Sequence, residues 1–219
     1  MRTLEVLQHC ESEFLGLIED HFEGRGIGFR YVRPFAAQGR VPATAFQADG
    51  LVLMGGGAWG AVGGPDGARL LPSLAAEVRL TKDFLARKKP VIAWGVGSQI
   101  LALAGGGAIE AGGLIFAVET ARRTVPGALG GYLPETFPLV SFMRDRPQPP
   151  PGAEILALDS AGRPACFKVA DTAIGFTGHP GIKPGILEDL LMEFDDPIQD
   201  SAGQPVDAGA LLETVRGLQ

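Results

Sequence analysis

The sequence contains one turn whose glycine spacing is typical of a nucleophile elbow, the sharp bend that presents a catalytic Ser or Cys between a strand and a helix. Gly95 and Gly97 flank Val96 directly after residues 90–94, whose apolar character predicts a buried strand. A hydroxyl or thiol at the apex of such a turn attacks a carbonyl carbon. Residues 95–97 include no Ser, Thr or Cys, so the turn lacks the group that this chemistry needs.

Three other side chains could serve such chemistry, and each also has a plainer interpretation. Ser98 stands beside the turn, but a hydroxyl in the first turn of a helix more often has a capping role. Cys10 follows the first predicted strand, so it could lie at the same sheet edge as Gly95 and substitute as nucleophile, or simply fill apolar space. His179 could act as a general base, or be a structural histidine bonded to the backbone.

The composition is that of a folded protein without a strongly charged partner. The chain has 219 residues, of which 46% are hydrophobic and 20% charged, as in a domain with a sizeable core. We therefore expect a single domain over residues 1–219. The net charge of −6 argues against the clustered basic surface that nucleic-acid binding requires, so no nucleic-acid partner is expected.

Several kinds of site and location are not indicated. The 2 cysteines and 3 histidines show no metal-type spacing, so we expect no metal site and no cofactor. The first residues become polar too early for a secretory signal, and no apolar run reaches roughly 18 residues. The sequence thus predicts a cytoplasmic protein without a membrane contact.

Apolar periodicity in the first half predicts an α/β fold. Ser12 fits the N-cap of the first helix and Gly24 its end. Strands that alternate with helices predict three layers, with a mostly parallel, doubly wound sheet and functional groups at the carboxyl ends of its strands. The predicted strands are residues 4–8, 28–32, 50–54 and 90–94, and the predicted helices are residues 14–22, 70–88 and a segment from Ser98 onward.

The second half has a different pattern. From Gly112 onward short β-like runs predict a small antiparallel extension of the sheet. Residues 147–152 contain four prolines and a glycine, which predict a stiff surface loop. The β-like runs are residues 114–120, 137–142, 154–158, 166–169 and 172–176, and helices are expected over residues 185–194 and 208–218.

The order of these elements, together with the elbow, resembles the class I glutamine amidotransferases, notably their GMP-synthase-like branch. In that family a Pro-Val strand enters Gly-hydrophobic-Cys-hydrophobic-Gly-His-Gln, and residues 93–99 read AWGVGSQ. Aligned on Gly97 and Gln99, the catalytic cysteine of the family falls on Gly95. The resemblance covers roughly residues 4–194 and implies a flavodoxin-like sheet.

A second motif is similar to the His-Pro-Glu signature of the same family. His179 matches the histidine, whereas Gly181 stands where the family has glutamate. In the family the histidine activates the cysteine and the glutamate orients the histidine. By this resemblance His179 is the one triad position retained, while Gly95 and Gly181 mark the positions of the lost nucleophile and the lost acid.

A third motif, residues 49–57, is similar to the family's glycine loop, whose backbone N–H groups stabilise an oxyanion. Asp145 matches a family loop near the glutamine pocket. Trp59 and Trp94 flank the expected pocket, as a ligand wall or as core residues. Residues 55–60 also match the G-x-G-x-x-G dinucleotide pattern, but turn residues rather than a helix follow them, which disfavours NAD. The resemblance implies oxyanion or ligand binding at Gly55, Gly56, Gly57, Val96 and Gln99.

Two functions follow as alternatives from the resemblance, and they leave open whether the chain is an enzyme. The first is a non-catalytic or re-purposed binding or partner subunit that lacks the nucleophile (Gly95) and the acid (Gly181). The second is a hydrolase of γ-glutamyl or related amides in which His179 activates a water molecule. Family members deliver ammonia to a synthase, so a synthase or other protein partner, or a homo-oligomer, is expected, with a small amide or amino-acid-like ligand.

Overall fold

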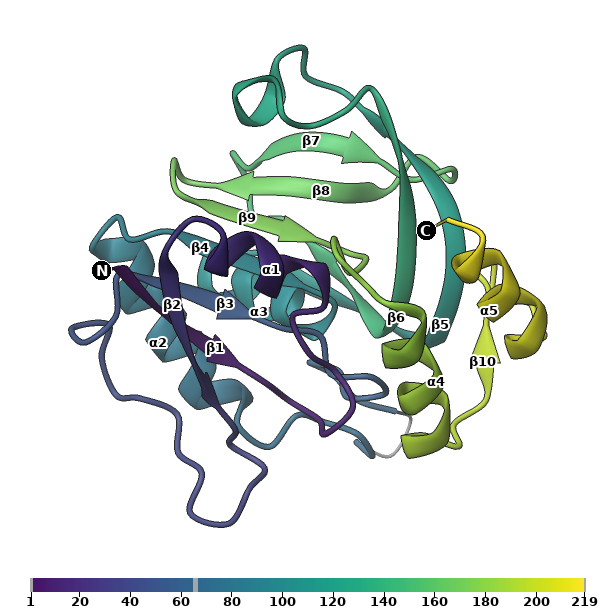
Figure 1. The fold of residues 1–219 in the computed structure, drawn as a ribbon, viewed down its shortest axis with the longest axis horizontal. Coiled ribbons are helices and arrows are strands. Elements are labelled where there is room, and N and C mark those ends of the chain that lie inside the picture. The colour runs from purple at the N-terminus through teal and green to yellow at the C-terminus, as the bar shows by residue number, and fades with distance from the viewer. Residues whose placement is uncertain (1, 65–66, 219) are drawn as a thin grey trace.

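The structure, a computed structural model, describes residues 2–64 and 67–218 and is organised around one mixed sheet (Figure 1). Five parallel strands form the half that carries the elbow, in the spatial order β2-β1-β3-β4-β9. This order is that of a flavodoxin-like doubly wound sheet, as predicted. The strands are β1 (Arg2–Leu7), β2 (Ile27–Val32), β3 (Gly50–Leu53), β4 (Val91–Trp94) and β9 (Ala173–Phe176).

The antiparallel extension continues the sheet beyond β9 through β8, β7 and β5. A long hairpin of β5 and β6 stands beside the parallel strands (Figure 1). A short strand, β10, adds to β5 in parallel and was not predicted. The bounds are β5 (Ala108–Arg123), β6 (Thr136–Gln148), β7 (Glu154–Leu158), β8 (Pro164–Val169) and β10 (Ile198–Gln199), with a 3-10 turn, η1, at Ala128–Gly131.

Helices cover both faces of the parallel strands, which gives the three layers (Figure 1). Because neighbouring strand residues point to opposite faces, Leu7 packs with Leu80 and Ile100 of α2 and α3, whereas Val6 packs in the cluster that α1 joins through Ile18. α4 and α5 pack over β5 and β6. The helices are α1 (Leu17–Glu23), α2 (Leu74–Ala86), α3 (Val96–Ala104), α4 (Pro184–Glu193) and α5 (Ala208–Arg216).

The first helix is shorter than predicted, and this difference shapes the site. Gly24 ends the helix as expected, but α1 begins at Leu17 after Gly16, and Ser12 is not its cap. Residues 11–16 instead run without helical structure, with Glu13 and Leu15 buried and Phe14 partly exposed. The amphipathic spacing predicted a helix from residue 14, but residues 14–16 belong to an irregular segment in which the side chains of Glu13 and Leu15 are buried.

The hairpin also departs from the prediction. Two of the β-like runs, residues 114–120 and 137–142, lie within the longer strands β5 and β6, and Pro147 lies in β6 rather than in a surface loop. The register of β5 and β6 shifts between Glu110 and Leu114, opposite Asp145, whose φ of 60° is left-handed. Aspartate tolerates this conformation when its short side chain finds local hydrogen-bond donors, and Asp145 does so.

Candidate functional site

The carboxyl ends of β1, β3, β4 and β9 bring four sequence-distant segments to one edge of the sheet. Glu13 comes from the segment after β1, the three glycines from the loop after β3, Gly95 from the turn after β4, and His179 from the loop after β9. In doubly wound sheets this edge holds ligands and catalytic groups. The structure thus places Gly95 and His179 around one small cavity.

Gly95 has the backbone of a nucleophile elbow without the nucleophile. It stands between β4 and α3 with φ 53° and ψ −128°, a conformation that is strained for any residue with a side chain. A Cβ atom at this position would lie 2.9 Å from the Cα of Gly55. Ser98 donates from its hydroxyl to the carbonyl of Gly95 over 2.6 Å and is buried, so the nearby hydroxyl is committed inside the first turn.

The cavity beside Gly95 is almost filled. Its volume is about 10 Å³, and its walls include Glu13, Trp94, Phe142 and His179. A cavity needs about 10–15 Å³ to admit one water molecule, so a glutamine side chain has no room as the chain stands. The elbow and the loops around it are therefore present, but the cavity between them has almost no free volume.

Glu13, a residue that the sequence analysis did not single out, occupies this space. Its Oε1 accepts a 2.8 Å hydrogen bond from Nε1 of Trp94. Burial raises the pKa of Glu13 to about 7, even though Trp94, the charge of His9 and the backbone N–H groups of Gly57 and Gly55 lower it. A buried carboxyl of this kind is largely protonated below neutral pH.

The glycine loop is packed against side chains of the same chain. Each glycine lies against a different neighbour: the carboxyl of Glu13 on Gly55, Val96 on Gly56 and Phe194 on Gly57. A Cβ atom on Gly55 would lie only 2.2 Å from Oε1 of Glu13. Of the glycines that the resemblance assigned to an oxyanion, Gly55 and Gly57 instead lie near the carboxyl group of Glu13, whose pKa their backbone lowers.

His179 is held in one tautomer by two backbone groups. Gly181 donates its N–H to Nδ1 over 3.1 Å, so Nε2 carries the proton, which it shares with the carbonyl of Phe14 at 2.9 Å. Burial lowers the pKa of His179 to about 4, against the hydrogen bond to Phe14, which raises it. The imidazole is neutral at physiological pH, and the lone pair on its Nδ1 already accepts the hydrogen bond from Gly181.

Gly181 has no space for the acid of a triad. A Cβ atom here would approach Cγ1 of Ile18 to 2.9 Å and the backbone N of Ile18 to 3.2 Å. The first turn of α1 also donates a hydrogen bond at this point, from the N–H of Leu17 to the carbonyl of Gly181 over 2.8 Å. Helix α1 thus fills the position from which an acidic side chain would orient His179.

A second buried group, missed by the sequence analysis, lies behind the glycine loop. Nδ1 of His9 faces the carbonyl of Gly55 at 2.9 Å, and Nε2 faces Oε2 of Glu77 at 2.7 Å, while Ser73 donates to the other oxygen of Glu77 over 2.6 Å. Burial lowers the pKa of His9, but Glu77 and the Gly55 carbonyl outweigh it and hold the pKa above its usual value. An imidazolium paired with a carboxylate satisfies every one of these contacts.

Cys10 and Trp59 do not join the elbow cavity. Cys10 is buried, and burial together with Glu13 raises the pKa of its thiol, which opposes a role as substitute nucleophile. Trp59 lines a separate small pocket with His9, Phe35 and Ser73, and the guanidinium of Arg69 lies 5.9 Å from its ring. Of the two tryptophans only Trp94 lines the elbow cavity.

Gln99 and Asp145 hold the loop after β3 rather than facing the cavity. Oε1 of Gln99 accepts from Ala61 N–H over 2.8 Å, and its amide donates to the carbonyl of Arg144. The carboxylate of Asp145 accepts from three backbone N–H groups, those of Val62, Gly63 and Gly112, at 3.0–3.1 Å. Both side chains are fully buried, so in this structure they anchor the loop instead of a ligand.

One signal in the sequence could have pointed to Glu13 and His9. Both follow the first strand directly, at the carboxyl edge where the analysis had already placed Cys10. An acid and a histidine at that edge are candidates for the site on position alone. The predicted helix over residues 14–22, with Ser12 as its N-cap, gave no indication that Glu13 lies in the site.

The fold is that of solved glutamine amidotransferases. A glutamine amidotransferase from Thermotoga maritima superposes with a TM-score of 0.75 at 21% identity, over 99% of this chain and 90% of that chain. One from Methylobacillus flagellatus gives a TM-score of 0.77 at 22% identity, over the same shares of 99% and 90%. A putative GMP synthase subunit from Thermoplasma acidophilum gives 0.63 at 15% identity, over 100% of this chain and 98% of that chain.

These likenesses define the chain as class I glutamine amidotransferase-like in fold. No protein-family model matches the chain, and a search of curated proteins gives no match either. Within residues 2–64 and 67–218 no cluster of three or more His, Cys, Asp or Glu side chains could hold a metal ion. In the same residues no helix has the length and apolar character needed to cross a membrane.

Proposed function

We propose that this chain is a non-catalytic, amidotransferase-like binding or partner subunit. One observation carries the proposal: both ring nitrogens of His179 are bonded to backbone groups, beside an elbow whose apex is Gly95. A triad needs the opposite arrangement, in which an acid accepts the proton of one nitrogen and the other nitrogen faces the nucleophile. The chain holds its histidine in a tautomer that does not serve this role.

The magnitude of the loss is large. Removing a covalent nucleophile reduces turnover by about six powers of ten, and only the contribution of binding and oxyanion groups remains. Here the oxyanion groups are also covered, because Glu13 lies against Gly55. Glutamine hydrolysis through a thioester is therefore not expected from this site.

The alternative, a hydrolase in which His179 activates water, finds no support in the geometry. A general base needs a free lone pair within hydrogen-bond reach of the proton that it removes. The lone pair of His179 lies on Nδ1 and accepts from Gly181. The low pKa of about 4, caused by burial, weakens it further as a base.

The partner role is supported by the fold and by one neighbour. The putative GMP synthase from Thermoplasma acidophilum is by its name a subunit, and its fold covers this whole chain. We propose by analogy that this chain also acts beside a second protein, and that a small amide or amino-acid-like molecule is the class of ligand that its remaining cradle fits. In such a complex this chain would bind the ligand but would not release ammonia from it.

The test is ammonia release from glutamine and a panel of γ-glutamyl amides by the wild type, Gly95→Cys and His179→Ala. We expect no release above background from any of them, including Gly95→Cys, because the cysteine would have no histidine lone pair to activate it. Gly95→Ala is the matched control for the strain of a side chain at φ 53°. Release by the wild type that disappears in His179→Ala would overturn the proposal in favour of the hydrolase.

A further inference from the structure

We infer that Glu13 is an internal ligand: its carboxyl group fills the polar cradle at the elbow, and a small carboxylate or carboxamide molecule reaches the cradle only when Glu13 is displaced. The inference rests on the proposed function, because it describes how a binding site without chemistry is closed.

The cradle offers hydrogen-bond donors from two strand ends, and Glu13 uses them. Trp94 donates Nε1–H to Oε1 over 2.8 Å, and the backbone of Gly57 and Gly55 lies close enough to the carboxyl group to lower its pKa. Both oxygens lie directly over Gly55, since a Cβ atom on that glycine would be 2.2 Å from Oε1 and 2.5 Å from Oε2. Carboxylate and carboxamide groups, which carry acceptor oxygens on a planar carbon, have the geometry that this position accommodates.

Glu13 and a second carboxyl or carboxamide group cannot share the cradle. The free volume beside Glu13 is about 10 Å³, which is room for a single water molecule at most. The same donors cannot serve two acceptor groups in that space. A ligand of this class must therefore take the place of the Glu13 side chain.

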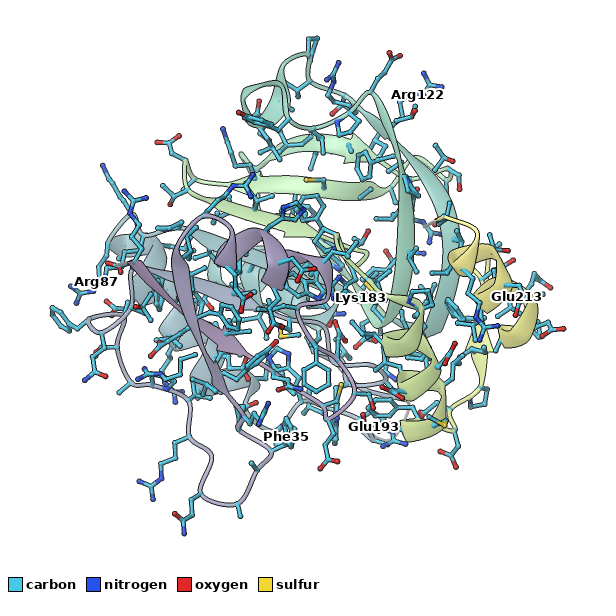
Figure 2. The ribbon with its side chains drawn as sticks, in the orientation of Figure 1. Phe35, Arg87, Arg122, Lys183, Glu193 and Glu213 are labelled. Atoms are coloured by element: carbon cyan, nitrogen blue, oxygen red, sulfur yellow. The ribbon has the colours of Figure 1, made fainter. Side chains whose placement is uncertain are left out.

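The segment that carries Glu13 is attached in a way that permits displacement. Residues 11–16 belong to no strand or helix. The N–H groups of Glu11 and Ser12 donate to the carboxylate of Glu193, labelled near the end of α4 in Figure 2, at 3.3 and 2.9 Å. Leu15 N–H donates to the hydroxyl of Tyr31, and the carbonyl of Phe14 accepts from His179. Each of these bonds has a side chain as one partner, so a displacement of residues 11–14 breaks no backbone hydrogen bond of the sheet.

The experiment compares calorimetric binding of two probes, L-glutamine and glutarate, by the wild type, Glu13→Ala and Glu13→Gln. Glu13→Ala empties the cradle, whereas Glu13→Gln is the matched control that keeps the side-chain size and an oxygen for Trp94. We expect Glu13→Ala to bind at least one probe about tenfold more tightly than the other two proteins, since a closed state lowers apparent affinity by the fraction that is open.

A second variant keeps the inference testable should Glu13→Ala fold poorly, which near-ultraviolet circular dichroism would reveal. Glu193→Ala lies outside the cradle and removes the acceptor of two segment N–H groups. We expect it to tighten binding of the same probe severalfold over the wild type. Equal affinity in the wild type and in folded Glu13→Ala, no binding by folded Glu13→Ala, or equal gain in Glu13→Gln would each overturn the inference.

Ammonia measured in the same samples separates this inference from the proposed function. Ammonia release by the wild type would contradict the non-catalytic function whatever the affinities are. Equal affinities without ammonia would contradict only the internal ligand. Tight binding by Glu13→Ala without ammonia is the expected result for both.

Discussion

The indole of Trp94 bonds directly to the buried carboxyl of Glu13, with 2.8 Å between Nε1 and Oε1. The ring of His179 also packs against this indole, with 4.8 Å between the ring centroids. Trp94 therefore contacts both an acid whose pKa is raised and a histidine whose pKa is lowered. The fluorescence of Trp94 can therefore report on the site. The two shifted pKa values also make the free energy of unfolding depend on pH, with opposite signs for Glu13 and His179.

The first prediction concerns fluorescence. The chain has 2 tryptophans, so Trp59→Phe leaves Trp94 as the sole tryptophan, which excitation at the red edge of the spectrum selects over tyrosine. Ionisation of Glu13 changes the charge at the indole N–H, and we expect the emission of Trp94 to titrate with a midpoint near the Glu13 pKa of about 7. The titration should be absent in Trp59→Phe/Glu13→Gln. A midpoint near 4.5 would show instead that the carboxyl is solvated.

The second prediction concerns stability and Glu13. Its pKa rises from 4.5 in the unfolded chain to about 7 on folding because of burial, so the folded state binds more protons between these values. Stability is therefore lost as pH rises from 4.5 to 7, by about 3 kcal/mol when complete. Glu13→Gln should unfold at higher urea concentration than the wild type at pH 8 and at a similar concentration at pH 4. A uniform difference at both pH values would contradict this.

The third prediction is the opposite dependence for His179. Its pKa falls from 6.5 to about 4 on folding because of burial, so the unfolded chain binds more protons between these values. The stability that this histidine contributes is present above pH 6.5 and is lost as pH falls toward 4, again by about 3 kcal/mol. In His179→Gln this loss on acidification should disappear. Urea unfolding at pH 4.5, 5.5 and 6.5 measures the slope.

The two dependences oppose each other in the same protein, which supplies an internal control. Between pH 4.5 and 6.5 the contribution of Glu13 falls and that of His179 rises. The wild type should therefore change less over this interval than either single variant. Slopes of the same sign in Glu13→Gln and His179→Gln would contradict the assignments.

The fourth prediction concerns the ion pair behind the glycine loop. His9 and Glu77 are both fully buried and 2.7 Å apart, so removing one charge leaves the other unpaired. Glu77→Gln should lower the unfolding free energy by about 3–5 kcal/mol at pH 6. Because the pKa of His9 is raised in the folded state, the contribution of the pair is complete below pH 6.5 and is lost as pH rises through the folded pKa.

Its control is the solvent-accessible pair of Lys168 and Glu154, which lies 2.9 Å apart on the antiparallel strands β8 and β7. Glu154→Gln should leave the urea midpoint nearly unchanged, since solvent screens such pairs. Chemical denaturation at pH 6 and pH 9 compares the two variants. A loss in Glu77→Gln as small as in Glu154→Gln would mean that His9 is neutral.

Most of the architecture could be predicted from the sequence because it follows local rules. The four early strands, residues 4–8, 28–32, 50–54 and 90–94, lie within a residue or two of the observed ones, since buried parallel strands are continuous apolar runs between turn residues. Glycine spacing also located the elbow. The absence of a side chain at Gly95 and of an acid at Gly181 is a property of the sequence alone.

Only the tertiary structure shows that Glu13 occupies the space beside the elbow. Helical spacing over residues 14–22 gave no indication that Glu13 points inward, because its partners Trp94 and Gly55 lie at the ends of other strands, far away in sequence. The tautomer of His179 likewise depends on Phe14 and on the backbone of Gly181. Local periodicity fixes which segments are strands, whereas burial, hydrogen-bond satisfaction and pKa arise where segments meet, and those contacts are properties of the folded chain.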